Sequence, residues 1–572
     1  MPSLGHLICL TPRDSYLADN PACRRGPIGW LEARTGPFVR SPGIAFPYLV
    51  GFLRRSGALP ENSRVVVQHD KIEGAIPFER VLRDKIDPAL GDHDVLFITS
   101  YTDSIREAYR RAREARAAWR AAGRGLTIAV GGAHASALPD EGVRHGHVDA
   151  GVPGEGEWSA ARLLADVIEG RPVQPVYREP FRRIRDRGAL SMDTSIWDGL
   201  TRRPHQIVAS TTFARGCKLD CHFCAVFLTN GPTVRNRDIH DVVAEIASQT
   251  PMDAGALPDA PGIYNAVLRA IGAVPLAGPR LRRRLARSAG PGFTRQFFFW
   301  DDNLYNAAGS AQALFEAVRP LGRPWAAELT IDIAEKPELL KLAYDSGCRD
   351  LFLGIESVSQ QAIDGLDKWS NDTSSMSEMV RRVHDAGINV MGSFVFGLDG
   401  DDDGIFDRTL EFIQQTGIDF VVANIVQPYP GTGTFRDAVA EGRLLPWTRC
   451  PGDADVGMDH NWALFDGAHV LVRPRTLGVQ QLQEGYRYFL RQAYSLTGIM
   501  RRFRGTPLQP GRAAAHMARN YLLSRYGMSK TAHALRDAGP VWTEQMLCDA
   551  APPAEPGAKR PEEPEPAPAL TS

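Results

Sequence analysis

Three cysteines stand close together in the segment ARGCKLDCHFC, at Cys217, Cys221 and Cys224. Thiolates are the usual ligands of iron–sulfur clusters, and three of them at this CxxxCxxC spacing can hold a four-iron cluster while one iron keeps an open coordination position. The alternatives are a zinc site and three unrelated core cysteines. Zinc normally takes four ligands from paired motifs, and although His222 lies inside the motif, no second CxxC or HxxxH follows it. The spacing therefore favours a cluster with an open iron.

Four later segments follow in an order that resembles the radical S-adenosylmethionine (radical SAM) superfamily. FFFWDDN (297–303) stands where that family binds the methionine amine, and GIES (354–357) stands where a carboxylate binds the ribose. NVMGSFVFGLDGDD (389–402) has small residues that allow close approach to adenine or methionine, and PYPGTGTF (428–435) resembles a closing strand and turn. The resemblance implies that the open iron chelates SAM, which is also bound by Asp301, Asp302, Asn303, Glu356 and Ser393.

The two aspartates have a second interpretation. Carboxylates that follow a strand also cap the next helix, because they accept hydrogen bonds from its first amides. Each of these segments is a weak signal alone. Their shared order after the cysteine motif favours the SAM site over the helix cap for Asp301 and Asp302.

The first 180 or so residues alternate short apolar stretches with helical ones. Near-continuous β-branched runs separated by helices are typical of a parallel sheet covered on both faces. We therefore expect a doubly wound α/β domain, whose ligand lies beyond the carboxyl ends of the strands. The expected strands are at 6–10, 64–70, 93–100, 126–132 and 148–154, and the expected helices are at 43–57 and 103–123.

Two stretches of this region resemble the cobalamin-binding domain of methionine synthase and its relatives. They are HDVLFITSYTDSIREAYRRA (93–112) and LTIAVGGAHASALPDE (126–141), and VPGEGE (152–157) resembles the next loop. Glycine lets a backbone approach a bulky ligand, and hydroxyls bond its polar atoms. A Gly-Gly pair after a strand also occurs in many α/β proteins. The resemblance implies that the nucleotide tail of the corrinoid is flanked by Thr99, Ser100, Thr102, Gly131, Gly132 and Ser136.

The chain departs from that family at one motif. The DxHxxG motif, whose histidine binds cobalt from below, is absent, because the loop after the first strand reads TPRDSYLADN (11–20). DIHDVV (238–243) has the aspartate and histidine but no glycine, and it lies beyond the cysteines. If cobalamin binds, we expect its cobalt to lack this histidine. His69, at the end of the second strand, is either a neighbour of the lower face or an ordinary polar strand-end residue.

A second series of strands and helices begins near residue 207, and such repeats are typical of a (β/α) barrel whose chemistry lies at the strand carboxyl ends. A basic run, RLRRRLAR (280–287), is either a solvated helix face or a patch for nucleic acid or a partner.

We expect a mixed α/β protein. Its parts are a Rossmann-like cobalamin-binding domain (1–180), a linker (181–206), a radical SAM core with a full or partial barrel (207–440, insertion 250–294), a mainly helical C-terminal region (441–548) and a disordered tail (549–572).

Composition limits the partners. The 572 residues include 66 basic and 67 acidic ones, so no overall positive charge attracts nucleic acid. No apolar run reaches the roughly 18 residues of a membrane span, and the N-terminus lacks the pattern of a signal peptide. The five other cysteines are scattered without the spacing of a disulfide framework. We expect a cytoplasmic protein that acts on a small molecule, without nucleic-acid or membrane partners.

The order of the parts resembles the cobalamin-dependent radical SAM methyltransferases. The resemblance implies that an electron donor such as flavodoxin or ferredoxin reduces the cluster, which cleaves SAM to a 5′-deoxyadenosyl radical. That radical takes hydrogen from a substrate carbon, which then receives the methyl group of methylcobalamin. The resemblance implies a role in natural-product biosynthesis, such as the biosynthesis of an antibiotic. In a variant, an electron-rich ring attacks methylcobalamin directly. The alternatives are a non-methylating cyclisation, rearrangement or oxidation, and a non-catalytic corrinoid sensor.

Several aromatic and basic residues are candidates for the wall of the substrate cavity. Tyr305, Lys368, Trp369 and Tyr429 stand near the motifs described above, although each of these types is more often found in packing. In the C-terminal region, tyrosines at helical spacing either cover the cavity or belong to the core. They are Tyr486, Tyr488 and Tyr494.

Overall fold

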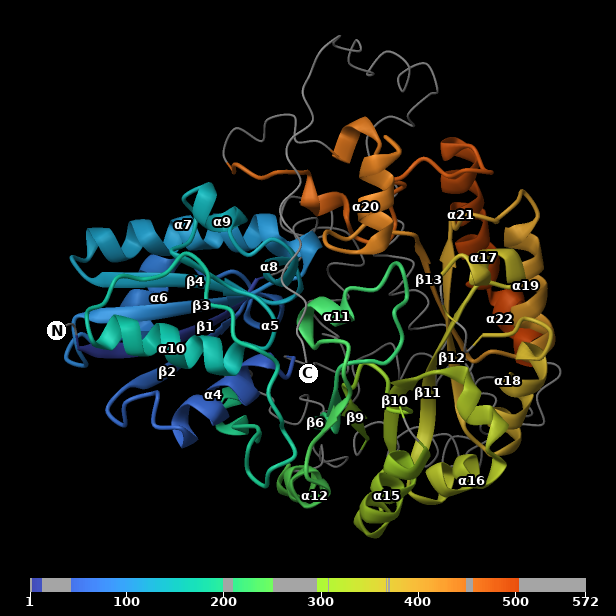
Figure 1. Cartoon of the computed structure of the whole chain (residues 1–572), viewed down its shortest axis with the longest axis horizontal. Helices are drawn as coiled ribbons and strands as arrows, with labels where there is room; N and C mark the ends of the chain where they lie inside the picture. The colour runs from blue at the N-terminus through green and yellow to red at the C-terminus, as the bar shows by residue number, and fades with distance from the viewer. Residues whose placement is uncertain are drawn as a thin grey trace, which may run out of the picture.

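The computed structural model describes two parallel sheets side by side, each with helices packed on it (Figure 1). The expected insertion at 250–294, the tail at 549–572 and Trp369 lie outside the described part of the chain. The described residues are 3–12, 43–198, 209–249, 296–306, 308–366, 368, 371–448 and 456–503.

The first sheet has five parallel strands in the order β2-β1-β3-β4-β5. Its central strands are buried on both sides, as their near-continuous apolar sequences require. Helices α4 and α10 cover one face and α6 and α7 the other, which is the expected doubly wound arrangement (Figure 1). The bounds are β1 (Leu4–Thr11), α4 (Ala45–Arg55), β2 (Arg64–His69), α5 (Asp70–Glu73), α6 (Phe78–Lys85), β3 (His93–Thr99), α7 (Ile105–Ala121), β4 (Gly125–Gly131), α8 (Ala133–Ala137), α9 (Glu141–Arg144), β5 (Ala150–Val152) and α10 (Gly156–Ile168).

The second sheet has six parallel strands in the order β13-β12-β11-β10-β9-β6. The strands follow one another in chain order, and β6 and β13 lie at the two edges, so the described strands form an open, partial (β/α) barrel. A large apolar core lies between the strands and the outer helices. The strands are β6 (Ala209–Thr211), β9 (Phe297–Phe299), β10 (Trp325–Leu329), β11 (Cys348–Glu356), β12 (Asn389–Phe396) and β13 (Phe420–Ile425), and the helices are α12 (Ile239–Ser248), α15 (Ala308–Val318), α16 (Pro337–Asp345), α17 (Gln360–Asp364), α18 (Met376–Asp385) and α19 (Ile405–Thr416).

Two C-terminal helices, α21 (Val479–Ala493) and α22 (Leu496–Phe503), pack on the outside of this second sheet against α19. Tyr486 is 2% exposed and donates its hydroxyl hydrogen bond to the Ala423 carbonyl at 2.8 Å. Tyr494 likewise bonds to the carbonyl of a β13 residue, and Tyr488 bonds to Asp407 on α19. Tyr486 and Tyr494 therefore anchor α21 to the barrel wall, whereas Tyr488 bonds at the surface, and none of the three lines the cavity described below.

After α20 (Gly433–Ala440), the chain returns to the first sheet through residues 456–471, here called the returning segment. Its Trp462 is fully buried in the core between the first sheet and α7. Glu141 on α9 accepts hydrogen bonds from the Trp462 indole at 2.7 Å and the Asp459 amide at 2.9 Å. The two halves of the fold are thus joined by buried contacts. None of the helices in the described ranges is long and apolar enough to cross a bilayer.

Candidate functional site

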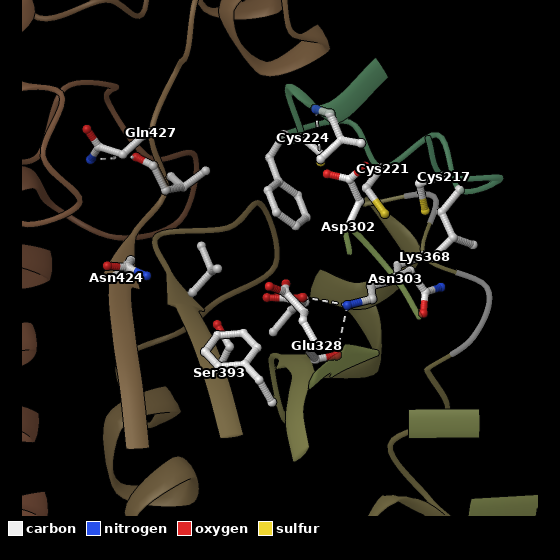
Figure 2. A pocket seen from close by; sticks show the side chains of 18 of the residues that line it. Cys217, Cys221, Cys224, Asp302, Asn303, Glu328, Lys368, Ser393, Asn424 and Gln427 are labelled. Atoms are coloured by element: carbon white, nitrogen blue, oxygen red, sulfur yellow. Dashed lines mark hydrogen bonds and ion pairs between the residues drawn. The ribbon is translucent and has the colours of Figure 1, made fainter. Parts of the chain in front are cut away.

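Cys217, Cys221 and Cys224 line one cavity of about 330 Å³ at the carboxyl ends of the second sheet. Figure 2 shows the three thiols on one wall, with side chains from β10, β12 and β13 around the remaining space. The loop that carries them, residues 216–225, is called the cysteine loop below. The motif recognised in the sequence is therefore brought to one place, as a cluster site requires.

The cysteine loop is shaped by a short hairpin. Strands β7 (Ala214–Arg215) and β8 (Arg235–Asn236) pair antiparallel and close residues 216–234 into a compact excursion. Gly216 has a φ of 86°, and a Cβ atom there would lie 2.4 Å from the Thr233 carbonyl oxygen. Only glycine meets both conditions without strain. The glycine before the first cysteine is therefore required by the turn.

Burial raises the pKa of all three thiols, to about 11 for Cys221 and about 12 for Cys224. As free groups they remain protonated at neutral pH, and binding iron would release their protons. Within the described ranges, no three His, Cys, Asp or Glu side chains are arranged to bind a single metal ion. A four-iron cluster places each thiolate on a different iron, so it does not need a common point. The donor set fits such a cluster.

The WDDN motif divides between two environments. Asp302 and Asn303 line the cavity. Asp301 is not among the lining residues, because its carboxylate accepts hydrogen bonds from the backbone amides of Phe213 (3.0 Å) and Ala214, between β6 and the cysteine loop. Burial nevertheless raises the pKa of Asp301 to about 7. Asp301 thus supports the strand that leads into the cysteine loop.

Asp302 is held from both ends of the excursion at 216–234 that the hairpin closes. Its carboxylate accepts hydrogen bonds from the Asn230 side chain at 2.9 and 3.1 Å and from the Gly216 amide at 3.2 Å. Burial raises the pKa of Asp302, and these donors oppose the rise. Both aspartates therefore bond to the cysteine loop or to the strand before it, which is not the arrangement of a helix cap.

Glu356 ends β11 in an unusual backbone conformation. Its φ is 65°, a left-handed value that is found at no other non-glycine residue of the described part of the chain. Strain of this kind persists only where the surroundings impose it, and it gathers at functional sites. The Glu356 carboxylate accepts a hydrogen bond from the Lys368 ammonium at 2.5 Å, and Lys368 also donates to the Gly354 carbonyl at 2.8 Å. Both charged side chains line the cavity.

Glu328 on β10 is a cavity residue that the sequence analysis did not single out. Its neighbours along the strand are buried, whereas its side chain projects into the cavity. Its carboxyl group has no hydrogen bond or ion pair with the described residues. Partial desolvation by the cavity walls, followed by repulsion from Glu356 and Asp302, raises its pKa to about 7. The signal in the sequence that could have identified Glu328 is the presence of a glutamate inside the apolar run WAAEL.

The remaining wall comes from the ends of β12 and β13 and from the returning segment. Ser393 and Tyr429 line the cavity, as does Lys368, whereas Tyr305 lies in the apolar core and does not. Gln427 lines it too, while its side-chain amide bonds to three backbone carbonyls, including that of His469 at 3.0 Å. The polar groups on this side are Ser393, Asn424, Gln427, Tyr429 and Asp466.

The residues selected from the cobalamin resemblance gather at the carboxyl ends of β3 and β4. Gly132 has a φ of 94°, and a Cβ atom there would lie 2.5 Å from the Ser100 carbonyl oxygen. The Ser136 hydroxyl donates to the Gly132 carbonyl at 2.8 Å and accepts from the Gly154 amide at 2.9 Å. Ser100, Thr102 and Ser136 are buried, while Thr99, Gly131 and Gly132 are partly exposed.

The carboxyl ends of the strands of the two sheets meet at one junction. Helix α8 follows β4 and packs against α11 (Val226–Thr229), which follows the cysteine loop (Figure 1). A Cβ atom on Gly431 would lie 2.7 Å from a Leu228 methyl group and 3.4 Å from the Ala137 Cβ atom. The turn after β13, α11 and α8 are therefore in contact. His69 ends β2 and is buried.

The chain is similar to known methyltransferases in sequence. It is 26% identical over 429 residues to bacteriochlorophyllide d C-12(1)-methyltransferase of Chlorobaculum tepidum, which covers 74% of this chain and 80% of that protein. No protein-family model matches the chain.

Solved structures with a similar fold include the radical SAM methyltransferase TsrM of Kitasatospora setae, with cobalamin and a 4Fe–4S cluster bound. It has a TM-score of 0.56 and 14% identity, over 92% of this chain and 100% of that one. The cobalamin-dependent SAM radical enzyme OxsB, with aqua-cobalamin and SAM bound, also has a TM-score of 0.56, with 11% identity over 96% of this chain and 78% of that one. The chain thus resembles cobalamin-dependent radical SAM enzymes in fold and methyltransferases in sequence, as its motifs indicated.

Proposed function

We propose that the protein is a cobalamin-dependent radical SAM methyltransferase that transfers a methyl group from SAM to a carbon atom of a small molecule. The observation that carries the proposal is the convergence of three thiols and the Asp302, Glu328 and Glu356 carboxyl groups on one cavity. Similarity to a methyltransferase over most of the chain supports it. Because SAM carries a sulfonium and an ammonium group, an acidic cavity beside the thiols is complementary to it.

Each cavity residue has a proposed role. Cys217, Cys221 and Cys224 ligate the cluster, and Asp302 and Asn303 accept hydrogen bonds from the methionine ammonium. Glu356 binds the ribose hydroxyls, with Lys368 holding its carboxylate in place. Ser393 lies beside the adenosine, and Asp301 orients the strand before the cysteine loop. When bound, the cluster supplies the electron that cleaves SAM and cobalamin carries the methyl group.

The corrinoid is proposed to lie at the carboxyl ends of the first sheet, with its tail beside Thr99, Ser100, Thr102, Gly131, Gly132 and Ser136. That edge adjoins the cysteine loop through α8 and α11, so a ligand held there is next to the cavity. The structure of TsrM with tryptophan bound supports a small-molecule substrate for a protein of this fold. We further propose that the substrate belongs to natural-product biosynthesis and that the protein acts in the cytoplasm. A flavodoxin or ferredoxin is the proposed electron donor to the cluster.

The test is anaerobic reconstitution with iron, sulfide and cobalamin, followed by incubation with methyl-labelled SAM, a low-potential reductant and candidate substrates. We expect S-adenosylhomocysteine to form only when cobalamin and reductant are both present, and a product heavier by one labelled methylene. Formation of 5′-deoxyadenosine in step with that product identifies the radical route, and its absence identifies direct attack by an aromatic ring. Product without added label contradicts methyl transfer and favours a cyclisation, rearrangement or oxidation.

A further inference from the structure

Two arginines beside the cysteine loop form ion pairs with glutamates that follow β5 of the first sheet. Arg215, two residues before Cys217, bonds to Glu157 at 2.7 Å, and Glu157 belongs to the first turn of α10. The two side chains are only 13% and 9% exposed. Buried charges of this kind are stable only when they are paired. The start of the cysteine loop therefore depends on an acidic residue of α10, a helix that packs on the first sheet.

The second arginine makes a two-pronged contact. Arg235 on β8 donates to both carboxylate oxygens of Glu155, at 2.9 and 2.7 Å, and Glu155 also lies 3.4 Å from Arg215. Arg235 donates further to the backbone carbonyl of Asn230 at 2.6 Å. A planar guanidinium with two parallel bonds fixes direction as well as distance. Glu155 thus sets the orientation of Arg235 and, through it, the position of Asn230.

The chain of contacts ends in the cavity. The side chain of Asn230 donates to both oxygens of Asp302, and the Gly216 amide, next to Arg215, donates to the same carboxylate. Asp302 lines the cavity beside the thiols. A continuous series of partly buried hydrogen bonds therefore connects the loop after β5 with a cavity carboxylate.

We propose that Glu155 and Glu157 are positioning residues for the cysteine loop, so that the loop after β5 and the start of α10 supply part of the cluster and SAM site. They hold Arg215 and Arg235, and these in turn hold the loop backbone and the Asp302 carboxylate in place. The inference deepens the proposed function and rests on it only in taking the cysteine loop as the cluster site. It assigns the loop after β5 a role towards the cluster in addition to any role towards cobalamin.

The test compares Glu157→Gln and Arg235→Lys with the wild-type chain after anaerobic reconstitution. Glu157→Gln removes one charge, and Arg235→Lys keeps the charge but loses the two-pronged contact. Glu378→Gln is the matched control, because Glu378 pairs with Arg381 and Arg382 on the exposed face of α18. Three quantities are measured: iron per chain, the electron paramagnetic resonance (EPR) spectrum of the reduced cluster with and without SAM, and the dissociation constant of SAM.

We expect both variants to lose at least half of their iron or to show an altered EPR response to SAM, with SAM affinity at least fivefold weaker. Glu378→Gln should match the wild type. Wild-type iron content, spectrum and affinity in Arg235→Lys would overturn the proposal, even if Glu157→Gln fails to fold. If the wild-type chain holds a cluster and binds SAM but transfers no methyl group, the proposed function fails while this inference stands.

Discussion

Glu328 is a carboxyl group that a cavity keeps partly protonated near neutral pH. Its pKa is about 7 in the fold, against an ordinary value of 4.5, so the folded chain binds more protons than the unfolded chain between these values. Stability from this group is therefore lost as the pH rises from about 4.5 to about 7. Above that range its ionised form is repelled by Glu356 and Asp302.

We expect Glu328→Gln, prepared without cofactors, to melt about 2 °C higher than the wild type at pH 8 and at the same temperature at pH 4.5. The effect is small because the side chain is open to water within the cavity. Thermal melts across this pH range are the measurement. A difference that is independent of pH would show that the substitution acts through packing instead.

The sequence identified residue types at the site better than side-chain directions. Asp301 and Asp302 are adjacent, and neighbouring residues in extended chain point to opposite sides. One of them therefore faces the cavity and the other the backbone before the cysteine loop, which motif position alone does not reveal. Glu328 was missed because the sequence shows that it interrupts an apolar strand but not which face of the strand it occupies.

At the scale of elements, the turn after β4 depends on a glycine for two reasons. Gly132 combines a φ of 94° with a carbonyl oxygen 2.5 Å from the place of its missing Cβ atom. Gly123 also has a positive φ, 67°, but nothing lies within 4 Å of that place. Substituting alanine at each of the two glycines therefore separates the free-energy cost of the positive φ from the cost of the close approach.

We expect Gly123→Ala to lower stability by about 1 kcal/mol and Gly132→Ala by about 2 to 4 kcal/mol, because the second must also displace the backbone of Ser100, directly after β3. Gly132→Ala should in addition weaken cobalamin binding, as followed by the absorbance of the retained corrinoid. Urea unfolding of both variants measures the difference. Equal losses in the two variants would contradict the structural role given to Gly132.

The elements with strong periodic patterns were predicted well. The strands of the first sheet overlap the five segments expected at 6–10, 64–70, 93–100, 126–132 and 148–154, because burial on both faces demands near-continuous apolar residues. The returning segment was not predicted. Its contacts with the first half of the fold, such as the bond from Trp462 to Glu141, join residues more than 300 positions apart, and no local pattern encodes such a partner. The ionic contacts of Glu155 and Glu157 could not be predicted from the sequence for the same reason.

At the scale of the whole molecule, the two sheets are fixed by a buried polar interface. The hydroxyl of Tyr48 on α4 donates to Glu245 at 2.6 Å and accepts hydrogen bonds from Arg237 at 2.8 Å and the Thr212 amide at 3.2 Å. All of these partners belong to the second half of the fold. The interface therefore favours a fixed relative position of the two sheets, in which the carboxyl ends of both sets of strands face the same junction.

We expect Tyr48→Phe to destabilise the chain by about 1 to 3 kcal/mol, because it leaves three buried partners without that hydroxyl. Tyr488→Phe is the control. Tyr488 is 38% exposed and its hydroxyl bonds to Asp407, so loss of this hydroxyl should change stability by less than about 0.5 kcal/mol. Thermal unfolding monitored by circular dichroism compares the two. Equal stability of both variants would show that the interface is not fixed in this way.

The central claim is that the cysteine loop binds an iron–sulfur cluster, and iron analysis tests it most directly. We expect about four iron and four sulfide per wild-type chain after anaerobic reconstitution. Cys217→Ala, Cys221→Ala and Cys224→Ala should each lose most of this iron, whereas Cys348→Ala, at the buried amino end of β11, should retain it. A wild-type chain without iron, or loop variants with wild-type iron and EPR spectra, would contradict the account.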